Sequence, residues 1–295
     1  MKKDLIIGGA SNYSWDQLKF WVNSIKKTGF DGEIVIVGTN LKKATIDKLK
    51  DEGVTLSLYG RTNADGDIVA HSNNAPHVER FFYIWNHLDN IESGLYENVI
   101  TTDTRDVIFQ TNPSHWLEEH MMGPLLVASS EGMLYKDEPW GNQNLLDAFG
   151  PFFHNILKDK AIYNVGTIAG ELETVKGLLS FIFHLSLNRP IPVVDQAVYN
   201  FILNQPNFWY DTLFTDNSDD WAIQLGTTLG AVKSGKGDLG MMFKNDPSSY
   251  EKIYHDVQPM FKDGLVCNPD GQPYCIVHQY DRVNDIREDI ERIYG

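Results

Sequence analysis

The first part of the chain alternates short apolar runs with longer segments in which apolar residues recur every three or four positions. Segment 14–29 shows the second spacing, with Leu18, Val22 and Ile25 on one side of a helix. The same pattern predicts a helix at 40–53 and strands at 3–10, 32–38 and 54–60. Strands and helices that alternate in this way form parallel sheets with right-handed crossovers. The pattern therefore predicts an α/β fold of the Rossmann type, with a mostly parallel central sheet flanked by helices.

The rest of the chain is less regular. After a polar stretch, the pattern predicts helices at 77–91 and 112–121, a fourth strand at 98–103 and a fifth at 123–131. Later strands are expected at 161–170 and 274–278, and later helices at 171–187, 193–205 and 283–294. No linker divides the chain, so we expect one domain over 1–295, with an α/β half (1–130) continuous with a mixed half (131–295).

Composition narrows the classes of function. The 295 residues are 42% hydrophobic and carry a formal net charge of −15, with no repeat or low-complexity segment. Nucleic acids and anionic membranes are bound through clustered Lys and Arg, so the charge argues against both as partners. A single phosphorylated small molecule remains compatible with it if a local cation screens the charge.

The N-terminus and the cysteines indicate a compartment. The apolar run after the first lysines is bounded by Asp4 and by Ser11-Asn12, which makes it too short for a signal peptide. No segment has the roughly 18–20 apolar residues that a membrane span needs. Cys267 and Cys275 could pair across "CNPDGQPYC", but a reducing cytosol favours two free thiols. We therefore expect a soluble, cytoplasmic protein.

The segment 97–113, "ENVITTDTRDVIFQTNP", places Asp103 and Asp106 just after the fourth predicted strand. Ligands of open α/β sheets bind beyond the carboxyl ends of the strands. Two neighbouring carboxylates repel each other, and a hard divalent cation such as Mg²⁺ or Mn²⁺ removes that conflict. In the alternative interpretation, Arg105 neutralises one carboxylate and the other caps the next turn.

Two later segments offer further candidate ligands. His278 follows a short apolar strand; an imidazole added to the carboxylates would favour Mn²⁺ over Mg²⁺, whereas a lone histidine can also be a satisfied core or surface residue. Asn164 precedes Gly166 and Gly170 in an apolar run. Glycines within a strand indicate close approach by a ligand or by other backbone, although a bulge followed by a helix start also fits.

Charged and aromatic side chains in helical segments have two interpretations each. Asp195 is either a site residue or a plain N-cap, and Arg80 either faces a ligand or lies on the polar stripe of its helix. Several aromatic residues could stack on a bound ligand or belong to the core: Trp140, Phe152, Phe153, Trp209 and Tyr210.

Taken in order, these motifs resemble the GT-A fold glycosyltransferases, in particular family 8 and related galactosyltransferase-like enzymes. The resemblance covers residues 4–282 and rests on "ASNYSW" after the first strand, "RFFYIWNHL" before "NVITTDTRDVIF", "YNVGTIAG" before "DQAVYNFIL", and "IVHQYDR". The family's acid motif is usually Asp-x-Asp, whereas this chain has Asp103-Thr104-Arg105-Asp106. Either aspartate could be the direct metal ligand, and Asp106 is slightly favoured by the apolar residues that follow it.

The resemblance implies transfer of a sugar from a nucleotide-diphosphate donor, with UDP as the expected nucleotide, to a glycan or other hydroxyl acceptor. It implies Mn²⁺ or Mg²⁺ held by Asp103, Asp106 and His278, and residues 1–130 as the donor-binding half. Catalytic roles fall to Arg80, Asp195 and Glu131. An inverting enzyme would use Asp195 as general base, and a retaining one would use it to position or stabilise the sugar. The implied donor contacts are Ala10, Asn12, Tyr13, Arg80, Thr102, Asp103, Thr104, Asn164 and Gly166.

Other classes fit the sequence less well. A nucleotidyltransferase needs a lysine in the glycine-rich loop after the first strand, and "IIGGASNYSWDQ" has no basic residue. A phosphatase of the haloacid dehalogenase type has its acids after the first strand, whereas here they follow the fourth. A sugar-nucleotide-binding protein with a decayed transferase site remains an alternative, and it predicts binding without turnover.

Overall fold

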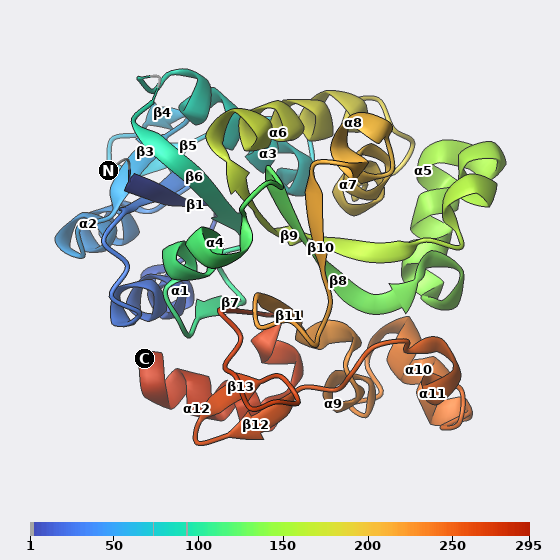
Figure 1. Ribbon diagram of the computed structural model, residues 1–295. Helices are drawn as coiled ribbons and strands as arrows, with labels where there is room; N and C mark the ends of the chain where they lie inside the picture. The colour runs from blue at the N-terminus through green and yellow to red at the C-terminus, as the bar shows by residue number, and fades with distance from the viewer. Residues whose placement is uncertain (1–2, 73, 93) are drawn as a thin grey trace.

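Helices and strands alternate through the first half of the chain in a computed structural model, which describes residues 3–72, 74–92 and 94–295 (Figure 1). The strands are β1 (Lys3–Ser11), β2 (Glu33–Thr39), β3 (Thr55–Leu58), β6 (Tyr96–Thr102) and β7 (Val107–Phe109). The helices are α1 (Trp15–Lys27), α2 (Lys43–Asp51), α3 (Pro76–Asp89) and α4 (Pro113–His120). The polar stretch before α3 contains a small hairpin that the sequence pattern did not predict, β4 (Arg61–Thr62) and β5 (Ile68–Val69).

The second half mixes long and very short elements. Its strands are β8 (Leu126–Leu134), β9 (Ala161–Glu171), β10 (Thr212–Thr215), β11 (Ala222–Gln224), β12 (Met260–Lys262), β13 (Leu265–Cys267) and β14 (Ile276–His278). Its helices are α5 (Pro139–Leu157), α6 (Leu172–Ser186), α7 (Asp195–Leu203), α8 (Pro206–Trp209), α9 (Leu229–Val232), α10 (Gly237–Asn245), α11 (Tyr250–Ile253) and α12 (Asn284–Tyr294). Helix α5 contains Trp140, Phe152 and Phe153 and kinks at Gly150, where φ is 74°, just before Pro151.

A seven-stranded sheet forms the centre of the molecule, in the order β10-β8-β9-β6-β1-β2-β3. The four strands predicted first, now β1, β2, β3 and β6, are parallel neighbours, as the alternating pattern predicts. Strand β9 runs antiparallel to β6 and to β8, so strands from the second half extend the sheet of the first. The expected mostly parallel α/β sheet with a mixed second half is confirmed.

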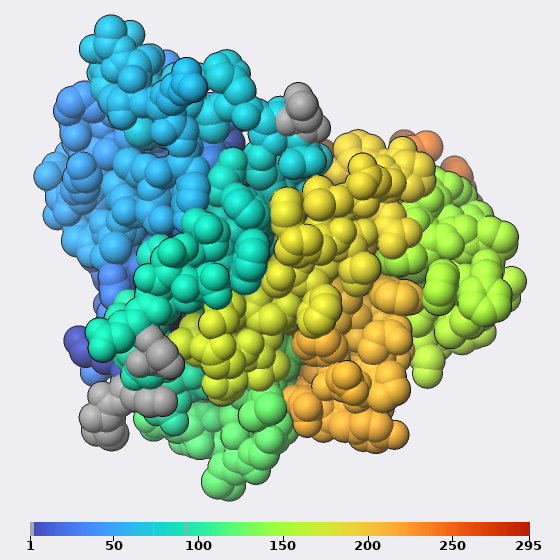
Figure 2. Space-filling model, turned by 90° about the horizontal axis from the view of Figure 1, so that it is seen from above, coloured from blue at the N-terminus to red at the C-terminus, as the bar shows by residue number. Residues whose placement is uncertain are grey.

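Successive side chains of the central strands bury on opposite faces of this sheet. In β1, Leu5 and Ile7 join one apolar cluster with residues of α3, α6 and α7, whereas Ile6 joins another with residues of α1. Helices α3 and α6 contact each other over the first face, and Figure 2 shows the yellow α6 alongside the blue-green α3. Both faces are therefore covered, which is why the strands read as continuous apolar runs.

A smaller sheet, in the order β11-β14-β7, lies against the second face. Its strands alternate as well: Val107 and Ile276 belong to the cluster shared with α1, whereas Ile108 and Val277 face α12. In its register, His278 of β14 is paired with Val107 of β7 and with Gln224 of β11. The small sheet thus brings a C-terminal histidine next to the acid motif.

Three further expectations can be compared with the structure. None of the helices among the described residues is long and apolar enough to cross a membrane. Cys267 and Cys275 are both buried and unpaired, as expected for reduced thiols. The core interpretation of the five aromatic side chains is wrong, because all are exposed: Trp140, Phe152, Phe153, Trp209 and Tyr210.

Candidate active site

The loop of the acid motif, residues 103–106, leaves the carboxyl end of β6 and is held by hydrogen bonds to three other segments. The amide of Asp103 donates to the carbonyl oxygen of Gly166 (2.9 Å). The hydroxyl of Thr104 donates to the carbonyl oxygen of Gly9 (2.9 Å). The carbonyl of Asp106 accepts from the amide of Gln279 (2.7 Å). Strands β1 and β9 and the segment after β14 therefore fix the direction in which both carboxylates point.

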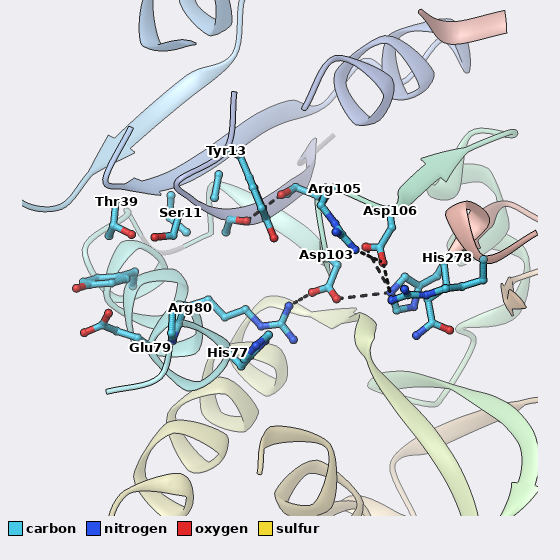
Figure 3. Close-up of a pocket in the computed structure, with 18 residues that line it drawn as sticks. Ser11, Tyr13, Thr39, His77, Glu79, Arg80, Asp103, Arg105, Asp106 and His278 are labelled. Atoms are coloured by element: carbon cyan, nitrogen blue, oxygen red, sulfur yellow. Dashed lines mark hydrogen bonds and ion pairs between the residues drawn. The ribbon is translucent and has the colours of Figure 1, made fainter. Parts of the chain in front are cut away.

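Asp103, Asp106 and His278 converge at this loop (Figure 3). One ligand atom from each lies within 4.8 Å of the others. The Nε2 atom of His278 is 3.5 Å from Oδ2 of Asp103 and 3.9 Å from Oδ1 of Asp106. Burial lowers the pKa of His278 and so favours the neutral imidazole, the form that binds metals. Two carboxylates and one neutral imidazole fit Mn²⁺ or Mg²⁺, and the nitrogen ligand favours Mn²⁺.

Gly166 makes room for this cluster. A Cβ atom at this position would lie 2.6 Å from Cε1 of His278 and 3.0 Å from Oδ2 of Asp103. Both distances are too short for an ordinary contact of a Cβ atom. Any side chain at this position would therefore displace His278 and Asp103. The close approach expected from glycine in this strand is therefore made by the side chains of His278 and Asp103.

Arg80 connects the cluster to Asp195. Its guanidinium forms an ion pair with Asp103 through Nη1, and Nη2 lies 3.2 Å from Oδ2 of Asp195. Asp195 is the first residue of α7 and makes no capping hydrogen bond, so its interpretation as a plain N-cap is wrong. Arg80 is also not a residue of a solvent-facing stripe, because its side chain is directed into the site (Figure 3).

Arginine side chains also surround Asp106. Arg105 lies 3.4 Å from Oδ2 of Asp106 and 3.5 Å from Asp281, and Arg282 lies 3.9 Å from Asp106. The alternative interpretation of Arg105 is therefore correct in one respect, since it does neutralise an aspartate of the motif. Asp103, however, pairs with Arg80 and His278, and does not cap a turn.

Glu131 lies in a hydrogen-bonded network behind the cluster. Its Oε1 atom accepts from Nδ2 of Asn164 (2.6 Å) and from Nε2 of Gln196 (2.9 Å). Asn164 in turn accepts from the amide of Gly166 (2.7 Å). Burial raises the pKa of Glu131. The network thus joins β8, β9 and the start of α7 on the side of the site away from β1.

Two cavities meet at the cluster. The first, of about 250 Å³, is lined by the ends of β1 and β2 and the start of α3, and includes Ala10, Tyr13, Thr104 and Asp106. The second, of about 560 Å³, is lined by the second half of the chain. It includes Glu131, Asn164, Gly166 and Asp195. Six residues line both cavities: His77, Arg80, Asp103, His278, Gln279 and Arg282.

Two of the predicted donor contacts lie elsewhere. Asn12 is exposed, and its amide donates to the hydroxyl of Ser11 (3.2 Å). Thr102 is buried beneath the site, where its hydroxyl accepts from Nε1 of Trp21 (2.9 Å) and donates to the carbonyl of Asp103 (2.8 Å). Neither residue lines the two cavities. Thr102 therefore supports the acid loop from below.

Several residues of the site were not anticipated from the sequence. The first cavity also contains Ser11, Thr39, His77 and Glu79, and the second also contains Glu138, Thr227 and Lys236. Thr39 could have been found, because it ends β2 beside Ser11 at the end of β1. Glu138 and Lys236 lie in irregular segments for which periodicity gives no signal.

The seven-stranded sheet with helices on both faces has the GT-A fold, which solved structures of glycosyltransferases share. No protein-family model matches the chain, and no curated protein has a similar sequence. Among solved structures, the bifunctional glycosyltransferase WbbM superimposes with a TM-score of 0.56 at 11% identity, over 98% of this chain and 50% of that one. The chain thus spans about half the length of WbbM. The galactosyltransferase LgtC, solved with donor and acceptor sugar analogues, gives a TM-score of 0.50 at 12% identity, over 93% of this chain and 86% of that one.

Proposed function

We propose that the protein is a metal-dependent glycosyltransferase that moves a sugar from a nucleotide-diphosphate donor, with UDP as the nucleotide, to a hydroxyl group of a glycan or another acceptor. The observation that carries the proposal is the position of the Asp103, Asp106 and His278 cluster at the junction of two cavities. Transfer between two substrates requires such a junction, because the diphosphate and the acceptor hydroxyl must both reach the same sugar carbon.

The first cavity suits the nucleotide. Its lining includes the hydroxyls of Ser11 and Thr39, which can hydrogen-bond a ribose or a base, and the ring of Tyr13, which can stack on a base. Arg105 and Arg282 line the end of the cavity next to Asp106 and present guanidinium groups to phosphate oxygens. Guanidinium donors, 3.4 and 3.9 Å from Asp106, therefore lie where a diphosphate would bind.

Asp103, Asp106 and His278 would hold a divalent cation at the junction of the cavities. When bound, such a cation supplies positive charge to the phosphate oxygens on which negative charge develops as the sugar leaves. The protein contributes the direction of the ligands, since the backbone of the acid loop is fixed at Asp103, Thr104 and Asp106.

The second cavity suits the sugar and the acceptor. Asp195 faces it from the start of α7, at a position from which a carboxylate could accept the proton of an acceptor hydroxyl or stabilise the sugar cation. Arg80 holds this carboxylate in place and also contacts Asp103. Glu131, fixed by Asn164 and Gln196, is another carboxyl group of this cavity.

Calorimetric titration of UDP tests the proposal, first with Mn²⁺ and then with EDTA, on the wild type and on Asp106→Asn. We expect binding that requires Mn²⁺ and is lost in the variant, because the amide lacks the charge that a cation needs. Asp159→Asn is the matched control: this acid forms an exposed ion pair with Lys136 and lies outside both cavities. It should bind UDP as the wild type does.

Hydrolysis of UDP-sugars then separates an enzyme from a binding protein. Release of free sugar that depends on both Mn²⁺ and Asp195 supports a transferase, whereas tight UDP binding without turnover supports a decayed site. Binding that is indifferent to EDTA would remove the metal from the proposal and leave the nucleotide cavity. Absence of binding for both UDP and GDP would overturn the proposal as a whole.

A further inference from the structure

Gln224 is buried between the metal cluster and the central sheet. Its Oε1 atom lies 2.7 Å from Nδ1 of His278, and its Nε2 atom donates to the hydroxyl of Thr167 at 3.0 Å. The exposed fractions of Gln224, His278 and Thr167 are 1%, 2% and 0%, so water does not compete for these bonds. Each polar end of the amide thus has a single protein partner.

The register of the small sheet fixes this arrangement. Gln224 ends β11, His278 ends β14, and the two residues are direct partners in the parallel ladder. Thr167 belongs to β9 of the central sheet and follows Gly166, the residue that gives the cluster its room. Gln224 therefore ties the imidazole to the rigid sheet on which the cluster is built.

The chemistry of the amide determines which nitrogen of His278 carries the proton. With Oε1 of Gln224 as acceptor, the proton lies on Nδ1, and the lone pair of Nε2 is directed toward Asp103 and Asp106. If the amide were turned over, it would donate to Nδ1 and move the proton to Nε2, where no metal could bind. Metal-binding histidines commonly have such a partner on the second nitrogen, which orients the ring.

We infer that Gln224 is a positioning residue of the metal site, which holds His278 in the tautomer and orientation that bind a cation. The inference rests on the proposed function, because it needs a cation at Asp103, Asp106 and His278. A side chain that only filled space would be replaced by leucine without effect on metal affinity. A side chain that selects the tautomer would be replaced by glutamate, whose carboxylate accepts the same hydrogen bond, but not by leucine.

The experiment measures Mn²⁺ binding in the presence of UDP by electron paramagnetic resonance, with electron spin echo detection of the imidazole nitrogen. The variants are Gln224→Leu and Gln224→Glu. We expect Gln224→Leu to raise the Kd for Mn²⁺ by roughly 10–100-fold and to weaken the nitrogen signal. Gln224→Glu should keep the nitrogen signal and bind Mn²⁺ at least as tightly as the wild type.

Gln110→Leu is the matched control. Gln110 follows β7 at the end of the small sheet away from His278. It connects this sheet to β13 through hydrogen bonds to the backbone of Val266 and Tyr274. Its loss should lower the stability of the same region but leave the Kd for Mn²⁺ and the nitrogen signal unchanged. If Gln110→Leu raises the Kd for Mn²⁺ as much as Gln224→Leu does, the effect comes from general loosening of the small sheet. That result would overturn the inference.

The remaining outcomes separate this inference from the proposed function. A wild-type Kd in Gln224→Leu, or loss of Mn²⁺ in a folded Gln224→Glu, would overturn the role of Gln224 and leave the acid cluster as a metal site. If Gln224→Leu does not fold, Gln224→Glu alone decides. Mn²⁺ bound without a nitrogen signal in the wild type would exclude His278 as a ligand and the inference with it. No Mn²⁺ binding by the wild type would overturn the metal-dependent function itself.

Discussion

Nη2 of Arg80 lies 3.2 Å from Oδ2 of Asp195, a residue 115 positions later in the sequence. The other terminal nitrogen of the same guanidinium pairs with Asp103. One guanidinium therefore neutralises an acid of the proposed metal cluster and an acid of the second cavity. This relationship links the place where a diphosphate would bind to the place where a sugar would react. A mutation of Asp195 can therefore test the role of one acid while the other is kept.

Asp195→Asn should uncouple binding from turnover. The amide oxygen can still accept from Arg80, so the fold and the geometry of Asp103 should persist, but the negative charge beside the sugar is lost. We expect hydrolysis or transfer to fall roughly 10²–10⁴-fold, the contribution typical of a proton-transfer group. UDP affinity measured by calorimetry should stay near the wild-type value. Equal loss of affinity and turnover would instead place Asp195 in the donor site.

Gly166→Ala should damage the metal cluster. The new Cβ would lie 2.6 Å from Cε1 of His278, and overpacking of this kind costs about 1–3 kcal/mol in the free energy of unfolding. The Kd for Mn²⁺ should rise as well, since His278 and Asp103 must move apart. Urea unfolding and a Mn²⁺ titration measure the two effects.

Gly177→Ala is the control for this prediction. Gly177 lies inside α6, and a Cβ there would meet no atom within 4 Å. Because alanine favours a helix over glycine, the variant should gain about 0.5–1 kcal/mol of stability and bind Mn²⁺ normally. A Gly166→Ala protein with unchanged metal affinity would show that the cluster tolerates displacement.

Thr102→Val distinguishes support of the acid loop from contact with the donor. The valine leaves Nε1 of buried Trp21 without its acceptor, which should cost about 1–3 kcal/mol of stability. UDP affinity should not change, because Thr102 does not line the cavities. Thr39→Val is the comparison: Thr39 lines the first cavity, so its loss should weaken UDP binding with little effect on unfolding. Weaker UDP binding by a Thr102→Val protein of unchanged stability would support the donor contact of Thr102 that the sequence predicts.

Glu138 should make stability depend on pH. Its carboxylate accepts from the amides of Trp140 and Gly141 at the start of α5, but burial raises its pKa from 4.5 to about 7. The folded state therefore binds the proton more tightly than the unfolded state, and this contribution is complete below the unfolded pKa and lost as the pH rises through about 7. Relative to Glu138→Gln, the wild type should lose on the order of 1–3 kcal/mol between pH 4.5 and 7. Parallel urea-unfolding profiles for the two proteins would contradict the prediction.

Much of the fold follows from periodicity because the first four strands and their helices are long enough to show it. Leu5, Ile6 and Ile7 bury on both faces of the sheet, and a parallel sheet covered on both faces produces such a run. The position of Asp103 and Asp106 follows in turn, since residues after a central strand lie at the ligand-binding edge.

The rest of the site depends on pairings that the sequence does not display. Strands β11 and β14 have three residues each, too few for a period, and their register alone brings Gln224 to His278 across 54 positions. The sequence also does not show the partner of Thr102. This residue ends β6 next to the site, but its hydroxyl accepts a hydrogen bond from Trp21. Sequence order located the acids, and tertiary packing decided which neighbours face them.

The position of β14 in the middle of the small sheet has a consequence for how the protein is made. Strands β7 and β11 lie on either side of β14 and do not pair with each other. Neither can complete its hydrogen bonds in this sheet until residue 278 has left the ribosome. The acids are synthesised about 170 residues before the histidine that joins them, as the positions of Asp106 and His278 require. Nascent chains can therefore pair β1, β2, β3 and β6 early, yet Asp103 and Asp106 meet His278 only after residue 278 has been made.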